Sequence, residues 1–227
     1  MKLKNIYEDL FTKWIDESLI DEDYPTSWNV DEFAALSSHA KRIEYANTNL
    51  KFIAGGSGRR VYQIDDEKVL KLATNKKGIA QNEMEIKYGA EDYYMKKIGR
   101  LANVFEYDEN NNLWVEMELA RKLSKSLFKK INGYSWDTYV DLISYYYYDT
   151  MGKDRYGRTK ETPDDVAQEI YEHEFYSDIA EMVGNYDLPI GDWVRLSSFG
   201  IVKRDGTDEV VVIDYGLNNE VYSSYYT

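Results

Sequence analysis

Residues 55–73 read GGSGRRVYQIDDEKVLKLA, and they contain the pattern that decides the fold. The runs RRVYQID and EKVLKLA are rich in the β-branched and aromatic residues typical of strands, and the acidic turn DDE separates them. The glycine-rich turn GGSG joins the first of these runs to a preceding one, KFIAG. Short turns between consecutive strands predict an antiparallel sheet.

The chain after this stretch continues as a helix, two more strands and then a mostly helical region. Residues 78–100 are too polar for a strand and long enough for a helix, whereas ANVFEYD and NLWVEMEL read as strands. Helical periodicity marks the N-terminal residues and the region after Arg121, and SFGIVKRDGTDEVVVIDYG predicts a hairpin. We therefore expect an α+β fold of two lobes: a helical extension over residues 1–49, a lobe over 50–121 with an antiparallel sheet and one helix, and a reduced, mostly helical lobe over 122–227.

The composition excludes several classes of protein. The 227 residues include 28 Lys and Arg, 41 Asp and Glu and no cysteine, which gives a formal charge of −13. Without cysteine there is no disulfide framework, thiolate metal site or thiol nucleophile. A strongly negative chain repels phosphate backbones and anionic lipids, so we expect neither nucleic acid nor membrane as a partner. We read no secretion signal and no transmembrane helix, and a cytosolic compartment fits the absence of cysteine without following from it.

The first candidate site residues are those that could meet a phosphate. Gly55, Gly56, Ser57 and Gly58 form a turn whose backbone could approach an anion closely, although an ordinary hairpin loop would look the same. Lys71 lies on the face of its strand opposite to its immediate neighbours, where its ammonium could reach a phosphate as a point charge.

A carboxylate on the predicted helix could hold Lys71 in an ion pair. Glu85 shares a helical face with Gln81 and Asn82, whereas Glu83 points elsewhere. We therefore prefer Glu85 as the partner and keep Glu83 as the alternative.

Two aspartates near the C-terminus complete the candidate set. The apolar strand VVVI runs directly into Asp214, and a carboxylate at the end of a buried strand suits Mg²⁺, which takes one or two carboxylates together with phosphate oxygens. Asp192 precedes it in LPIGDW, where a second carboxylate could orient or deprotonate a hydroxyl group.

In this order, the elements resemble the protein-kinase-like fold over residues 52–216. GGSGRRVY resembles the glycine-rich loop, VLKLA the strand with the lysine, and QNEMEI the helix with its glutamate. ENNNLWVEMELA resembles the strand into the hinge, GDWVRLSSFGIV the catalytic loop, and VVVIDYG the metal-binding DFG segment. The set is similar to small kinase-like proteins of phages and bacteria.

The resemblance implies ATP and Mg²⁺ as cofactors and a role for each matching residue. Asp192 would be the catalytic base, and Asp214 would bind Mg²⁺. Ser198 or Ser197 would stand where the family has an asparagine as its second metal ligand. The nucleotide would be held by the glycine turn, by Lys71 braced by Glu85, and by the hinge backbone, which gives the set Gly55, Gly56, Ser57, Gly58, Lys71, Glu85, Glu118 and Ala120.

Departures from the family pattern keep more than one function open. Ile190 and Gly191 replace the His-Arg before the catalytic aspartate, and the chain ends at Thr227, soon after the DFG-like segment. The leading hypothesis is an ATP- and Mg²⁺-dependent phosphotransferase of the Ser/Thr protein-kinase type that acts on a protein hydroxyl. The alternative is a pseudokinase, a catalytically inactive nucleotide-binding, regulatory or phage assembly module. A small-molecule kinase of the aminoglycoside type ranks third. The expected partner is accordingly a protein substrate or an assembly partner. The expected location is cytoplasmic, which means the host cytoplasm or the virion if a phage encodes the chain.

Overall fold

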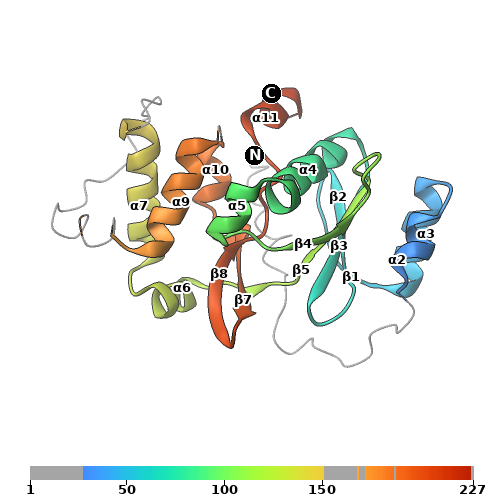
Figure 1. The fold of residues 1–227 in the computed structure, drawn as a ribbon, viewed down its shortest axis with the longest axis horizontal. Coiled ribbons are helices and arrows are strands. Elements are labelled where there is room, and N and C mark those ends of the chain that lie inside the picture. Colours follow the sequence, from blue (N-terminus) through green and yellow to red (C-terminus); the bar gives the residue numbers. More distant parts are fainter. Residues whose placement is uncertain (1–27, 151–167, 169–171, 187, 226–227) are drawn as a thin grey trace, which may run out of the picture. The chain divides into compact units, whose positions relative to one another are not determined.

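The structure of the chain is a computed structural model that describes residues 28–150, 168, 172–186 and 188–225 (Figure 1). The fold class is α+β, as predicted. The chain divides into two compact units, and the first 27 residues of the predicted helical extension lie outside the described part. We call residues 28–91 together with Ala102–Lys122 the sheet unit, and Asp92–Leu101 together with the described residues from Leu123 onward the helical unit.

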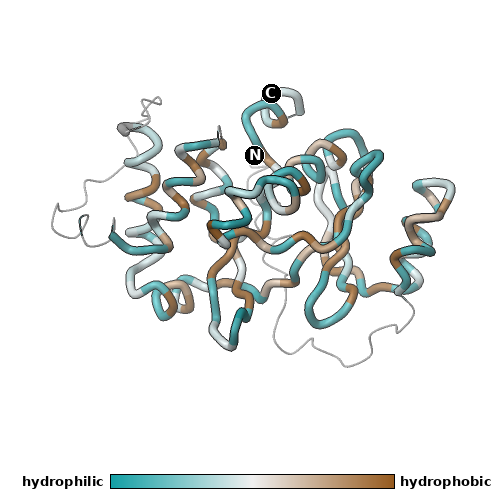
Figure 2. The backbone as a smooth tube through the Cα atoms, viewed as in Figure 1, coloured by the Kyte–Doolittle hydropathy of each residue, from teal (hydrophilic) through white to brown (hydrophobic). Residues whose placement is uncertain are grey.

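The sheet unit contains a five-stranded antiparallel sheet with the strand order β1-β2-β3-β5-β4. Figure 2 shows apolar segments in these strands and hydrophilic residues in the turns from β2 to β3 and from β4 to β5. This is the pattern from which the strands were predicted. The strands are β1 (Lys51–Gly55), β2 (Arg59–Gln63), β3 (Lys68–Ala73), β4 (Val104–Tyr107) and β5 (Trp114–Glu118), and the short β6 (Arg121–Lys122) follows them.

Helices cover both faces of this sheet. Helix α4 (Lys76–Ile86) packs on the face that carries Lys71. Helices α2 (Val30–Ala34) and α3 (His39–Asn49) pack on the opposite face, and in Figure 1 they lie on the other side of β2 and β3 from α4. The side chains of Asn29, Ser38 and Asn75 cap the first turns of these helices. The core on the α2–α3 side consists of Phe33, Ala46, Leu50, Tyr62, Ile64, Leu70, Leu72 and Trp114.

The helix predicted over residues 78–100 is in fact interrupted. Helix α4 ends at Ile86 and continues as a π-helical segment, η2 (Lys87–Glu91). A new helix, α5 (Tyr93–Ile98), then begins after Asp92, whose carboxylate accepts hydrogen bonds from the N–H groups of Tyr94 and Met95 at 2.9 and 3.0 Å. This N-cap starts a separate helix, and α5 belongs to the helical unit.

The helical unit combines helices with the hairpin predicted near the C-terminus. In that hairpin Asp205 and Gly206 both have positive φ values, 50° and 82°, as a two-residue type I′ turn requires. None of the helices in the described part of the chain has the length and apolar character needed to cross a bilayer. The elements are α6 (Lys125–Asn132), α7 (Trp136–Tyr145), η3 (Tyr146–Thr150), α9 (Glu174–Asn185), α10 (Ile190–Trp193), the 3₁₀ turn η4 (Leu196–Ser198), β7 (Phe199–Arg204), β8 (Thr207–Val212) and α11 (Asn219–Tyr225).

Candidate functional site

The glycine turn connects β1 to β2 and is bonded to the residue after β3. The N–H of Gly56 donates to the carbonyl oxygen of Arg59 at 2.9 Å, which closes the turn. The carbonyl oxygen of Gly58 accepts two hydrogen bonds from Thr74, one from its N–H at 2.8 Å and one from its hydroxyl at 2.9 Å. Gly55 and Gly56 are exposed, whereas Gly58 is buried.

The turn is also attached to the beginning of α4. The side-chain amide of Asn75 donates to the Ser57 carbonyl at 2.7 Å, and the Lys77 ammonium donates to the Ser57 hydroxyl at 2.8 Å. Burial lowers the pKa of Lys77. A Cβ atom on Gly78 would overlap with the carbonyl group of Gly58, so a glycine is needed for the turn to lie this close to the helix. The turn is therefore held in one conformation by the segment that follows β3.

Lys71 pairs with Glu85, as expected. Its ammonium lies 2.8 Å from Oε1 of Glu85, whose side chain is fully buried, while Lys71 is 7% exposed. Glu83, the alternative partner, is exposed. The strand register explains this contact. Leu70 and Leu72 of β3 point to the core under α2 and α3. Lys71, which pairs with Val61, therefore points to the other face, on which α4 packs.

Arg59 is a second cation at this carboxylate, and it was absent from the predicted partners. Its Nη1 atom lies 2.6 Å from Oε2 of Glu85 and 3.5 Å from the Oδ1 atom of Asn82. Alternation along β2 and β3 could have placed it there, because Arg59 pairs with Ala73 on the same face as Lys71. Two cations on one carboxylate form a set of formal charge +1, which is the sign that attracts phosphate.

Residues 118–120, which follow the hinge-like strand β5, have three backbone N–H groups, and two of them donate to carbonyl oxygens of other segments. The N–H of Glu118 donates to Asn103 O at 2.8 Å, and the N–H of Leu119 donates to Glu67 O at 2.7 Å. Of the three amides in residues 118–120, that of Ala120 is therefore the one outside these two bonds. The resemblance assigned the backbone from Glu118 to Ala120 to adenine without choosing one of its amides.

Ser198 and Asp214 flank the end of the β7–β8 hairpin at which Phe199 pairs with Val212, and Asp192 precedes the hairpin in α10. Ser198 is buried and directly precedes β7, and its carbonyl oxygen accepts from the N–H of Ile213 at 2.8 Å, so it lies beside the residue before Asp214. Asp192 is in α10, where its Oδ1 atom lies 3.1 Å from Nη1 of Arg195. Ser198 and Asp214 thus place a hydroxyl and a carboxylate, both oxygen donors of the kind Mg²⁺ prefers, at the same end of the hairpin.

A buried tyrosine supports the helix that carries Asp192. The hydroxyl of Tyr139, a fully buried residue of α7, donates to the carbonyl oxygen of Trp193 at 2.8 Å. Burial raises the pKa of Tyr139 well above its usual value, so the hydroxyl remains a donor. Tyr139 belongs to an aromatic cluster with Phe128, Trp136 and Phe199, whose ring centroids lie 4.9–6.0 Å from its own. Sequence reasoning missed this anchor because its two ends are far apart in the chain.

The predicted site residues therefore fall into two sets, one in each unit. The structure brings Lys71 together with Glu85, the glycine turn together with the start of α4, and Ser198 beside the residue that precedes Asp214. The sheet unit holds Gly55, Gly56, Ser57, Gly58, Lys71, Glu85, Glu118 and Ala120, and the helical unit holds Asp192, Ser197, Ser198 and Asp214.

Comparison with known proteins gives structural neighbours only. No protein-family model and no curated protein sequence matches the chain. Among solved structures the chain is similar to the streptomycin–ATP–APH(2")-IIa ternary complex, with a TM-score of 0.35 and 10% identity over 80% of this chain and 71% of that one. It is also similar to SAICAR synthase from Saccharomyces cerevisiae complexed with SAICAR, with a TM-score of 0.31 and 12% identity over 73% of each chain. At such TM-scores the likeness carries no argument about function.

Proposed function

We propose that the chain is an ATP-dependent phosphotransferase of the protein-kinase-like type. The observation that carries the proposal is the buried ion pair between Lys71 and Glu85, on the α4 face of a sheet whose β1–β2 turn is glycine-rich and anchored. A buried lysine held by a carboxylate is a fixed positive charge, and fixed charges stabilise a phosphoryl group in transfer without reorganising.

The sheet unit would bind the nucleotide. Backbone N–H groups of the glycine turn and the Lys71 ammonium would contact the phosphates. Glu85 would be a positioning residue that acts through Lys71. The adenine ring would accept a hydrogen bond from the Ala120 N–H and donate one to the carbonyl oxygen of Glu118.

The helical unit would supply the groups that act on the acceptor. In the proposed reaction the acceptor oxygen bonds to the γ-phosphorus, the bond from that phosphorus to the bridging oxygen of ADP breaks, and Asp192 takes the hydroxyl proton. Asp214 and Ser198 would hold Mg²⁺, which when bound supplies positive charge to the phosphate oxygens. The acceptor proposed is a Ser or Thr hydroxyl of a protein.

A nucleotide-binding module without transfer is the second candidate. It is favoured by the Arg195 guanidinium, which lies 3.1 Å from Oδ1 of Asp192 and so already contacts the carboxylate that would have to accept the proton of the acceptor hydroxyl. Ile190 and Gly191, in place of the His-Arg of the family, point the same way.

The test measures binding and transfer separately. Mg-ATP binding is followed by calorimetry, and transfer from γ-labelled ATP is followed on the chain itself and on protein fractions. We expect Lys71→Met to lower transfer by about 100-fold or more. The control is Lys68→Met in the same strand, because Lys68 points to the opposite face and should leave transfer within about twofold.

The outcomes separate the candidates. Loss of transfer in both Lys71→Met and Asp192→Asn supports the phosphotransferase. Mg-ATP binding without any transfer by the wild-type chain supports the binding module instead. Wild-type transfer that survives Asp192→Asn contradicts the proposed base, and failure of the wild-type chain to bind Mg-ATP contradicts both candidates.

A further inference from the structure

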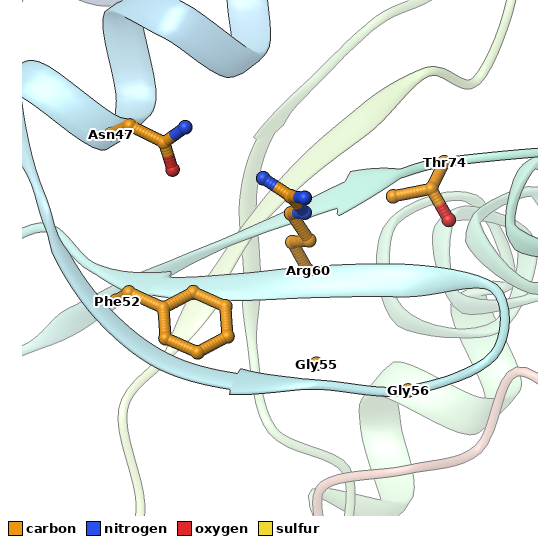
Figure 3. Close-up of a pocket in the computed structure, with 6 residues that line it drawn as sticks. All are labelled: Asn47, Phe52, Gly55, Gly56, Arg60 and Thr74. Carbon is orange, nitrogen blue, oxygen red and sulfur yellow. The ribbon is translucent and has the colours of Figure 1, made fainter.

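A pocket of about 580 Å³ lies on the other side of the glycine hairpin from Lys71. Figure 3 shows that residues from β1, β2, α3 and the end of β3 contribute to it. Its volume is within the range of small-molecule sites. It is lined by Asn47, Phe52, Gly55, Gly56, Arg60 and Thr74.

The strand register shows that this pocket and Lys71 are on opposite faces of the sheet. Arg60 pairs with Leu72, and Leu72 belongs to the core under α2 and α3. Val61 pairs with Lys71 on the α4 side. Since successive residues of a strand point to opposite faces, Arg60 cannot share a face with Lys71. Arg60 and Lys71 therefore lie on opposite faces of the sheet, and the pocket shares only Gly55 and Gly56 with the residues proposed to hold the nucleotide.

The lining combines a cation, polar groups and an exposed ring. In Figure 3 the guanidinium group of Arg60 projects from β2 toward the space between Asn47 and Thr74. The ring of Phe52 is 54% exposed, and its other contacts include an edge-to-face packing with Tyr62 at 5.6 Å between centroids. An arginine fork pairs with carboxylate or phosphate, and an exposed ring offers a flat apolar surface to a ligand.

Further positive charge lies near Arg60. Burial is the main cause that lowers the pKa of His39 in α3, and the charges of Arg42 and Arg60 lower it further. Both guanidinium groups therefore lie near His39. The positive charge at the pocket is therefore that of Arg60, with Arg42 of α3 in the neighbourhood of the same histidine. A guanidinium group in the lining favours an anion over a neutral molecule of the same shape.

We propose that this pocket is a second ligand site, which binds a small aromatic anion. The phosphate or carboxylate of the ligand pairs with Arg60, with the side chains of Asn47 and Thr74 beside it, and the ring of the ligand packs on Phe52. Because Gly55 and Gly56 line the pocket, the ligand contacts the β1–β2 hairpin. The side chain of Lys71 lies on the opposite face of the same sheet.

The test is a titration of the full chain followed by ¹H–¹⁵N NMR. Phenyl phosphate and benzoate are the anionic probes, benzyl alcohol is the neutral probe of similar shape, and inorganic phosphate lacks the ring. We expect saturable shifts at Asn47, Gly55, Gly56 and Thr74 with an anionic aromatic probe. Binding by benzyl alcohol and by inorganic phosphate should each be weaker by about tenfold or more. The stronger of the two anionic probes shows whether the site prefers phosphate or carboxylate.

The variants test the individual contacts. Arg60→Gln should weaken binding by about tenfold, and Arg60→Lys, which keeps the charge and loses the fork, should fall between it and the wild type. Lys41→Gln is the control, because it removes one charge from α3 at an exposed position outside the lining. The proposal is overturned if no anionic probe saturates, if benzyl alcohol binds equally well, or if Arg60→Gln behaves like Lys41→Gln.

Discussion

Gly58 and Gly78 lie so close together that a Cβ atom on Gly78 would overlap with the carbonyl group of Gly58. The two residues belong to the β1–β2 turn and to the first turns of α4, and the Gly58 carbonyl already accepts both hydrogen bonds of Thr74. The position of the glycine turn thus depends on the absence of a side chain at residue 78.

We therefore expect Gly78→Ala to move the turn and to destabilise the sheet unit. Overpacking costs about 1–3 kcal/mol, and alanine recovers up to about 1 kcal/mol through its higher helix propensity. The free energy of unfolding in urea should fall by the difference, and Mg-ATP binding should weaken with it. Gly56→Ala is the control for stability, because a Cβ atom at Gly56 would have no neighbour within 4 Å. Equal stabilities of the two variants would show that the close contact does not hold the turn.

The buried carboxylate of Glu85 should contribute strongly to stability. Glu85→Gln removes a charge that two cations, Lys71 and Arg59, contact at 2.8 and 2.6 Å. Removing one member of a buried ionic set typically costs about 3–5 kcal/mol, since the remaining charges lose their compensation. Glu83→Gln is the same change two residues earlier in an exposed position of the same helix, and it should stay within about 0.5 kcal/mol. Chemical denaturation of both variants measures the difference, and a similar loss in both would refute the role assigned to Glu85.

The stability of the sheet unit should decrease as the pH rises through the titration of Glu116. Burial raises the pKa of this carboxyl, which is 2% exposed; the hydrogen bond from Trp28 and the charge of Lys68 oppose the shift, and Glu106 and Asp65 add to it. The folded state therefore holds the proton more tightly than the unfolded state. The resulting stabilisation is complete below the unfolded pKa of about 4.3 and is lost as the pH rises through the higher folded pKa.

The comparison that isolates this group is Glu116→Gln, which can still accept from Trp28 at its side-chain oxygen. Burial also raises the pKa of Asp178 in the helical unit, so the wild-type curve alone contains more than one contribution. The difference in unfolding free energy between the variant and the wild type, measured from pH 4 to pH 7, removes the Asp178 part. As the pH rises, the stability of Glu116→Gln relative to that of the wild type should increase, because the wild type loses the stabilisation from its bound proton. A stability difference that does not change with pH would contradict the assignment.

In the sheet unit, local sequence patterns were sufficient to predict a side chain's direction wherever that direction depends on a single strand or helix. Alternation along β3 put Lys71 opposite to Leu70 and Leu72, and helical spacing favoured Glu85 over Glu83. Both inferences need only the direction of a side chain on its own element. The same is true of the turn at Asp205 and Gly206, whose residue types alone favour positive φ.

Contacts between distant elements could not be predicted in this way. The second cation on Glu85 depends on the register between β2 and β3, and the fit of Gly78 against Gly58 depends on how close α4 approaches the hairpin. The interruption of the long helix had a local signal that was overlooked, because Asp92 is a good N-cap residue in the middle of a helical stretch. The roles of Asp192 and Asp214 in catalysis remain predictions.

The anchor of α10 gives a prediction that tests the positioning of Asp192. Tyr139→Phe removes the hydroxyl that donates to Trp193 O, leaves the aromatic packing in place, and should cost about 1 kcal/mol of stability. If Asp192 is the base, the loss of this anchor should lower the transfer rate while Mg-ATP binding by the sheet unit stays unchanged. Tyr176→Phe removes a comparable buried hydroxyl, which donates to Leu142 O at 3.3 Å rather than to α10. A fall in the transfer rate for Tyr139→Phe alone supports the positioning role, whereas equal rates for both variants would show that the Trp193 bond serves stability only.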